Sequence, residues 1–126
     1  MRDEDLISEK TLCRRFDPVT GWLVCVSGME MGRDYRIHSG MNDIGRSIDM
    51  DIQIVDDERI SMLDHCRIVY DPKSNCFYIL PLNGNPVYLN EKHISSSERL
   101  EENDHIRIGL SDFVFIPYCE GQRKWG

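Results

Sequence analysis

The sequence predicts an all-β sandwich, and three observations support this fold class. From Trp22 onward, about ten short stretches either alternate apolar and polar residues or are continuously apolar. Turn-forming residues separate these stretches at close intervals, and no long segment shows an apolar period of 3.6 residues. Short strands at close spacing are typical of a sandwich or barrel, in which the loops gather at the two ends.

The expected strands follow one another along most of the chain. In order, they are residues 22–26, 35–38, 51–55, 66–70, 76–80, 87–89, 106–109 and 113–116. Residues 71–75 contain a proline and an asparagine, which favour a hairpin loop between two of these strands. We expect turns at Ser39-Gly40, at Asn90-Glu91-Lys92 and at Asn42–Arg46, the last of which would present an arginine.

One folded domain accounts for most of the 126 residues. A chain of this length buries a real core but is too short for two ordinary domains. Residues 1–20 are rich in charge, so we expect a flexible tail with a short helical turn around Leu6–Leu12. We place the domain at residues 21–118 and a C-terminal tail at residues 119–126.

Charge and cysteine usage exclude several classes of protein. The net charge of −7 argues against binding to nucleic acid or anionic membranes, because either needs a basic face. No apolar run is long enough to insert across a bilayer, and no signal peptide is evident. Five cysteines without a CxxC spacing favour free thiols in a reducing compartment. We expect a cytoplasmic monomer without metal or cofactor.

One arginine and one serine stand out as candidate ligand-binding residues. Arg46 follows a glycine, and Ser61 lies fifteen residues further along, with His65 beyond it. An arginine supplies a charge-assisted fork and a serine supplies a neutral hydrogen bond, which together can hold a phosphate monoester. Two loops of a rigid β scaffold would present them.

The order of the motifs resembles the forkhead-associated (FHA) domain, over about residues 21–118. The pieces, in chain order, are Ile44-Gly45-Arg46, Ile52 and Ile54, Ile60-Ser61 with His65, Leu82–Asn85, Val87–Asn90, Leu100 with Asn103–Gly109, and Phe113–Phe115. The resemblance implies an eleven-stranded β-sandwich that binds phosphothreonine peptides without catalysis. It also implies a small bacterial-type module of Ser/Thr-kinase signalling, whose partner is a phosphothreonine-containing protein.

The resemblance assigns a role to each matched residue. Arg46 would reach the phosphate or the peptide backbone, and Ser61 would donate its hydroxyl to the phosphate. Asn85 would hold the main chain of the peptide. Gly45 would permit a tight turn close to the ligand, and the ring of His65 would brace the binding loops by hydrogen bonds.

The chain also departs from the family pattern around this site. Met62 follows the serine where the family has a polar or basic residue, and Gly84 replaces a threonine that often contacts phosphate. The extra residue between Ser61 and His65 predicts a bulge or shifted loop around Leu63-Asp64. Asp64 also adds a negative charge near the pocket. Two further cations could compensate, namely Arg59 and Arg67.

Three further hypotheses follow from the residues. The departures from the family pattern at Met62, Asp64 and Gly84 favour a degenerate FHA domain that acts as a phosphate-independent interaction scaffold. A Cys–His hydrolase that uses Cys66 or Cys76 is a remote alternative, because no nucleophile motif is present. Phosphorylation of Thr11 in the tail would create a phosphothreonine tethered to its own reader.

Overall fold

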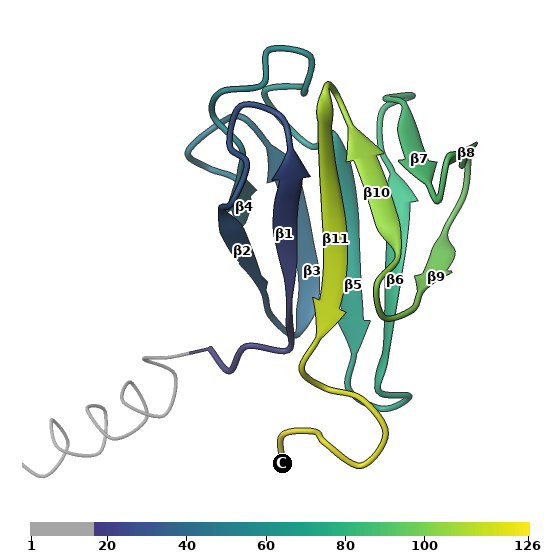
Figure 1. Ribbon diagram of the computed structural model, residues 1–126. Helices are drawn as coiled ribbons and strands as arrows, with labels where there is room; N and C mark the ends of the chain where they lie inside the picture. The colour runs from purple at the N-terminus through teal and green to yellow at the C-terminus, as the bar shows by residue number, and fades with distance from the viewer. Residues whose placement is uncertain (1–16) are drawn as a thin grey trace, which may run out of the picture.

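The computed structural model describes residues 17–126 and confirms the all-β sandwich (Figure 1). In this part of the chain, eleven strands form two sheets. The strands are β1 (Gly21–Ser27), β2 (Asp34–Ile37), β3 (Gly40–Gly45), β4 (Ile52–Gln53), β5 (Cys66–Asp71), β6 (Cys76–Pro81), β7 (Val87–Leu89), β8 (Lys92–His93), β9 (Glu98–Leu100), β10 (His105–Ile108) and β11 (Ser111–Pro117). Sheet A has the order β2-β1-β11-β10-β7-β8, and sheet B has the order β4-β3-β5-β6-β9.

Strand β3 corrects the predicted turn at Asn42–Arg46, whereas the turn at Ser39-Gly40 is confirmed by a bend at Ser39 and by φ 80° at Gly40, the first residue of β3. Residues 40–45 form a strand that pairs with β5, and Arg46 is the first residue after it. Asn42 suggested a turn, but its buried side chain donates to the carbonyl oxygens of His38, Gly40 and Ile68. A buried amide with these partners is compatible with a strand, because its polar atoms are satisfied.

Other local expectations are confirmed or refined. Asn75 adopts φ 56° in the loop between β5 and β6, as a hairpin turn requires. Asn90 and Glu91, with φ 50° and 71°, form the turn between β7 and β8. Lys92 already belongs to β8, and the short strands β8 and β9 were not predicted, because only Leu100 among their residues is buried. The predicted helical turn at Leu6–Leu12 lies outside the described residues.

The core lies between the two sheets and is made mostly of isoleucine and phenylalanine. Inward-facing residues alternate along most strands, as in β10, where Ile106 and Ile108 are fully buried. Phe115 packs against Phe77 of the opposite sheet, with ring centroids 4.8 Å apart. Alternation of this kind specifies the strand register, because a shift by one residue would expose the buried set.

The candidate binding loops gather at one end of the sandwich, which we call the loop end. It comprises residues 28–33, 46–51, 54–65, 82–86 and 109–110, and Figure 1 shows it at the top. The loop between β5 and β6 and both ends of the described chain lie at the opposite end. Arg46 and Ser61 therefore lie at the same end of the sandwich, on loops that connect strands of sheet B.

Residues at both predicted domain limits contact the sandwich. Thr20 is buried, and its hydroxyl donates to the carbonyl oxygen of Ile37 at 2.8 Å. Cys119 is buried as well. Trp125 stacks on Tyr118, and its indole nitrogen donates to the carbonyl oxygen of Val19 at 2.7 Å. These contacts continue the folded part on both sides, and the division at 20/21 and 118/119 stays a prediction.

Replacing Ile68 with alanine tests the packing of the two sheets. Ile68 is fully buried on β5, so the Ile68→Ala change removes core contacts and leaves a cavity. We expect the free energy of unfolding to fall by about 2–5 kcal/mol. The neighbouring Val69→Ala change, at a half-buried position on the other face of β5, should cost about 1 kcal/mol or less. Equal losses in chemical denaturation would contradict the assigned register.

Candidate phosphopeptide-binding site

Arg46 is held at the start of the loop after β3 by two contacts with the loop that carries Ser61. Its backbone N–H donates to the carbonyl oxygen of Ser61 at 3.0 Å. Its side-chain Nε donates to the carbonyl oxygen of Ile60 at 2.6 Å. Among residues 17–126, no hydrogen bond or ion pair involves its two Nη atoms. The guanidinium is thus oriented through Nε, with its other donors available to an anion.

Ser61 and Asn85 come together from different loops. The Ser61 hydroxyl donates to Oδ1 of Asn85 at 2.8 Å, and both side chains are half-buried. The amide nitrogen of Asn85 donates to the carbonyl oxygen of Leu82 at 2.9 Å. The loops that carry Arg46, Ser61 and Asn85 therefore meet, as the sequence resemblance implied.

His65 connects the same two loops from below. It is buried, and its Nδ1 accepts the backbone N–H of Ser61 at 3.0 Å. Because Nδ1 is an acceptor, the ring proton lies on Nε2, which donates to the carbonyl oxygen of Pro86 at 3.0 Å. Burial lowers the pKa of His65 from its ordinary value, although the Pro86 carbonyl and the carboxylate of Asp57 act in the opposite direction. The ring is therefore neutral and holds Ser61 at a fixed distance from Pro86.

Two buried carboxylates, which the sequence did not single out, tie the Ser61 loop to sheet A. Glu30 accepts the backbone N–H of Asp56 at 2.9 Å and the hydroxyl of Tyr35 at 2.5 Å. Its several hydrogen-bond partners and Arg33 lower the pKa of Glu30 in spite of the opposing effect of burial. A single acidic residue in a loop is usually exposed to solvent. The only sign in the sequence that Glu30 is buried was the apolar residue on each side of it.

Asp57 performs the same function at the turn between β10 and β11. Its carboxylate accepts the backbone N–H of Leu110 at 2.8 Å and the hydroxyl of Ser111 at 2.6 Å. Gly109 is in the left-handed region with φ 62°, and a Cβ there would lie 2.8 Å from Oδ1 of Asp57. The absence of a side chain at Gly109 lets the buried carboxylate approach the turn.

Gly45 has a different physical role from the predicted turn. It ends β3 and is absent from the residues with positive φ. A Cβ at Gly45 would lie 2.7 Å from the carbonyl oxygen of Met62. That oxygen accepts the backbone N–H of Ser47 at 2.9 Å, so Gly45 permits the close approach of the two loops.

The side chains that depart from the family pattern lie at the surface of the loop end. Met62 is 53% exposed. Gly84 is exposed with φ 72°, and a Cβ there would meet nothing within 4 Å. Asp64, in the segment between Ser61 and His65, has φ 49°. Its carbonyl oxygen accepts a hydrogen bond from Asn83 at 3.2 Å, so the lengthened loop is held in place.

Two cations beside the site have unequal environments. Arg67 forms an ion pair with Asp43 at 2.5 Å, and the hydrogen bond to that carboxylate raises the pKa of the guanidinium. Arg59 is exposed on the Ser61 loop and forms no ion pair among the described residues. The loops 46–51 and 54–65 carry more acidic than basic residues, so the surroundings of Arg46 are negative overall.

The two cysteines considered for hydrolysis lie outside this site. Cys66 is fully buried, and burial raises the pKa of its thiol, which keeps it protonated. Cys76 is half-buried on β6, where its thiol donates to the carbonyl oxygen of Ser74 at 3.2 Å.

Residues 17–126 contain no cluster of three or more His, Cys, Asp or Glu that could hold a metal ion. The same part of the chain has no helix able to cross a membrane.

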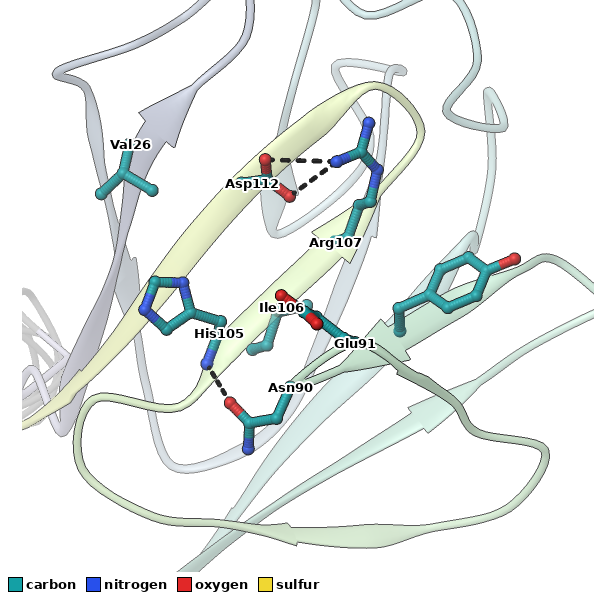
Figure 2. A pocket seen from close by; sticks show the side chains of 8 residues that line it. Val26, Asn90, Glu91, His105, Ile106, Arg107 and Asp112 are labelled. Carbon is teal, nitrogen blue, oxygen red and sulfur yellow. Dashed lines mark hydrogen bonds and ion pairs between the residues drawn. The ribbon is translucent and has the colours of Figure 1, made fainter.

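A cavity of about 740 Å³ lies away from the loop end site, on the outer face of sheet A. Figure 2 shows His105, Glu91 and Val26 among the residues that line it. The guanidinium of Arg107 is paired with Asp112, with N–O distances of 3.3 Å. None of the residues predicted to bind phosphate lines this cavity.

The ionisation of His65 provides a direct test of the bridge between the loops. In the unfolded chain His65 takes up a proton as the pH falls through about 6.5, whereas the folded chain resists until a lower pH. The stabilisation by the neutral ring is thus complete above pH 6.5 and decreases below it. We expect NMR to find the Nε2–H tautomer and a titration midpoint below 6.5. A midpoint above 6.5, or the Nδ1–H tautomer, would contradict the bridge.

Comparisons with known proteins agree with this architecture. A family model of the FHA domain matches residues 42–109. Among solved structures, Mycobacterium tuberculosis EmbR in complex with a low-affinity phosphopeptide is 29% identical with a TM-score of 0.65, and the match covers 86% of this chain and 25% of EmbR. The FHA domain of an Arabidopsis thaliana hypothetical protein is 26% identical with a TM-score of 0.68, covering 85% of this chain and 92% of that domain.

A third similar structure comes from a study of phosphothreonine-dependent FHA domain interactions. It is 27% identical with a TM-score of 0.65, and the match covers 76% of this chain and 94% of the other. No curated protein gives a significant match. The family model spans more than half of the 126 residues, and the two-sheet fold agrees with it. The chain belongs to the FHA domain family.

Proposed function

We propose that this chain is a phosphothreonine-peptide-binding interaction module of Ser/Thr-kinase signalling, which binds without catalysis. The observation that carries the proposal is the junction of three loops. Arg46, anchored through Nε, lies on a loop bonded to that of Ser61, and Ser61 bonds Asn85. Similar structures support it, since one is described by phosphothreonine-dependent interactions and another was solved with a phosphopeptide.

Binding requires one rearrangement within this site. The Ser61 hydroxyl donates to Asn85 in the free chain, so it must turn towards a phosphate oxygen when the ligand arrives. Oδ1 of Asn85 is then free to accept a backbone N–H of the peptide. Arg46 keeps its Nε bond to Ile60 and offers its Nη donors to the phosphate. The backbone of the site stays in place, because His65 holds it from below.

The supporting cations contribute unequally to the proposed pocket. Arg67 would have to leave its ion pair with Asp43 to reach a ligand, so Arg59 is the better candidate for an auxiliary contact. Met62 and Gly84 supply no charge or hydroxyl, and we assign them contacts with the peptide rather than with the phosphate. We expect a lower affinity than a pocket with two polar residues at these positions would give.

The second candidate function is a phosphate-independent interaction scaffold. It is favoured by the exposed apolar side chains at the loop end, which include Met29, Met31, Ile48, Met62, Leu63 and Leu110. Exposed apolar groups beside a weak anion pocket suit a protein surface as well as a peptide.

Four free thiols among the described residues fit a reducing compartment, and we propose a cytoplasmic, monomeric protein.

Phosphorylation of Thr11 stays a proposal, and its geometry favours binding in trans. The described chain begins at Asp17, at the end of the sandwich opposite the loop end (Figure 1). The six steps along β1, from Gly21 to Ser27, already span about 20 Å of the distance to the loops. The six residues from Thr11 to Asp17 reach at most about 20 Å when fully extended. A phosphorylated Thr11 would therefore more readily engage a second copy of the chain.

Titration with a phosphothreonine peptide and its unphosphorylated form tests the proposed function. We expect Arg46→Ala to weaken phosphopeptide binding about tenfold or more, because a charge-assisted hydrogen bond is lost. Ser61→Ala should weaken it less, and Arg36→Ala, at an exposed position on β2, should leave it unchanged. Equal binding of both peptide forms would favour the scaffold instead.

The Arg46→Lys change separates charge from geometry at the same position. Lysine keeps the positive charge but cannot donate to the Ile60 carbonyl and to a phosphate from one planar group. Calorimetry should therefore show a loss of affinity close to that of Arg46→Ala. Wild-type affinity in the lysine variant would mean that the anchored fork is not required.

A further inference from the structure

Strands β1 and β11 are apolar on both faces, unlike the strand beside them. Trp22–Val26 and Phe113–Ile116 are continuous apolar runs, whereas His105–Ile108 of β10 alternates polar and apolar residues. Continuous apolar runs are typical of strands that are covered on both sides. The inner face of β1 and β11 is covered by sheet B. The apolar residues on their outer face therefore indicate that another segment covers this face as well.

The outward-facing residues of β1 and β11 form a stripe, which we call the outer stripe. Antiparallel pairing places Trp22 beside Ile116 and Val24 beside Val114. Val26, at the end of β1, is 42% exposed and adjoins the cavity of about 740 Å³ in Figure 2. The apolar surface thus continues from the base of β1 into a groove.

Within residues 17–126, only one end of the outer stripe has an aromatic cover. Tyr118 contacts Trp22 edge to face, with ring centroids 6.3 Å apart, and Trp125 stacks on Tyr118. The same Trp125 bonds the carbonyl oxygen of Val19 and so fixes the place where the chain enters β1. Val19 consequently lies beside the covered end of the stripe.

Residues 10–16 have the composition needed to cover the other end. This segment, Lys-Thr-Leu-Cys-Arg-Arg-Phe, contains two large apolar residues and three basic residues without an acidic one. Residues 1–16 together carry as many acidic as basic side chains, so the net charge of −7 belongs to residues 17–126. A basic, apolar segment is therefore tethered beside an acidic domain with an apolar stripe, and tethering favours contact.

We propose that residues 10–16 dock on the outer face of sheet A, with Leu12 and Phe16 against Val24, Val26 and Val114. The six steps from Lys10 to Phe16 span about 20 Å when extended, and the five steps from Gly21 to Val26 span about 17 Å, so the segment is long enough. The basic side chains would lie near acidic groups such as Glu91 at the rim of the groove. Docking holds Thr11 on the sheet, away from Arg46, whether or not the loop end binds phosphate.

Paramagnetic relaxation in the full-length chain tests this docking. Cys13 lies inside the segment, and Cys76→Ser removes the half-buried thiol, while Cys25, Cys66 and Cys119 are buried. A nitroxide on Cys13 should broaden the amide signals of residues 24–26, 105–107 and 112–114. Signals from the outer face of sheet B, such as those of Met41 and Val69, should stay sharp.

Matched variants and dilution make the outcomes decisive. Leu12→Asp should remove the broadening on sheet A, whereas Ile7→Asp, outside the segment, should retain it. The broadening should also be independent of protein concentration. Equal, weak broadening of both sheets, broadening centred on residues 46 and 61, loss on dilution, or retention in Leu12→Asp would each overturn the proposal.

Discussion

The bridge made by the buried imidazole of His65 is the contact on which the site depends. One ring nitrogen accepts the N–H of Ser61 and the other donates to the carbonyl of Pro86, so two loops from different parts of the chain share one rigid element. Neither a charged imidazole nor a residue with a single polar atom can do both. The low dielectric around the ring keeps it neutral and strengthens both hydrogen bonds.

Elsewhere in the loop end, buried side chains also fix exposed loops by accepting hydrogen bonds from the backbone N–H groups of those loops. Glu30 holds Asp56, and Asp57 holds the turn at Leu110 and Ser111. These bonds use fixed partners in the interior, and they leave the tips of the loops exposed. Binding groups such as Arg46 are therefore oriented before a ligand arrives, which reduces the entropy lost on binding.

The fold, and the fact that the loops of Arg46, Ser61 and Asn85 meet, could be predicted from the sequence, because motif order and alternation carry that information. Asn42 was misassigned, since an asparagine that suits a turn also suits a strand once its amide is buried and satisfied. Gly45 was predicted to permit a turn. A glycine is needed there because the carbonyl oxygen of Met62 approaches from another loop, and no local sequence pattern encodes that contact. Long-range partners such as Glu30 and Asp57 could not be predicted for the same reason.

We propose that a phosphate engages the joined loops of Arg46, Ser61 and Asn85. The most direct measurement is an NMR titration of the isotope-labelled chain with a phosphothreonine peptide, followed residue by residue. We expect shifts confined to residues 46–47, 61–65 and 82–86, with none produced by the unphosphorylated peptide. Shifts centred on the face of either sheet, or the same shifts with both peptides, would contradict it.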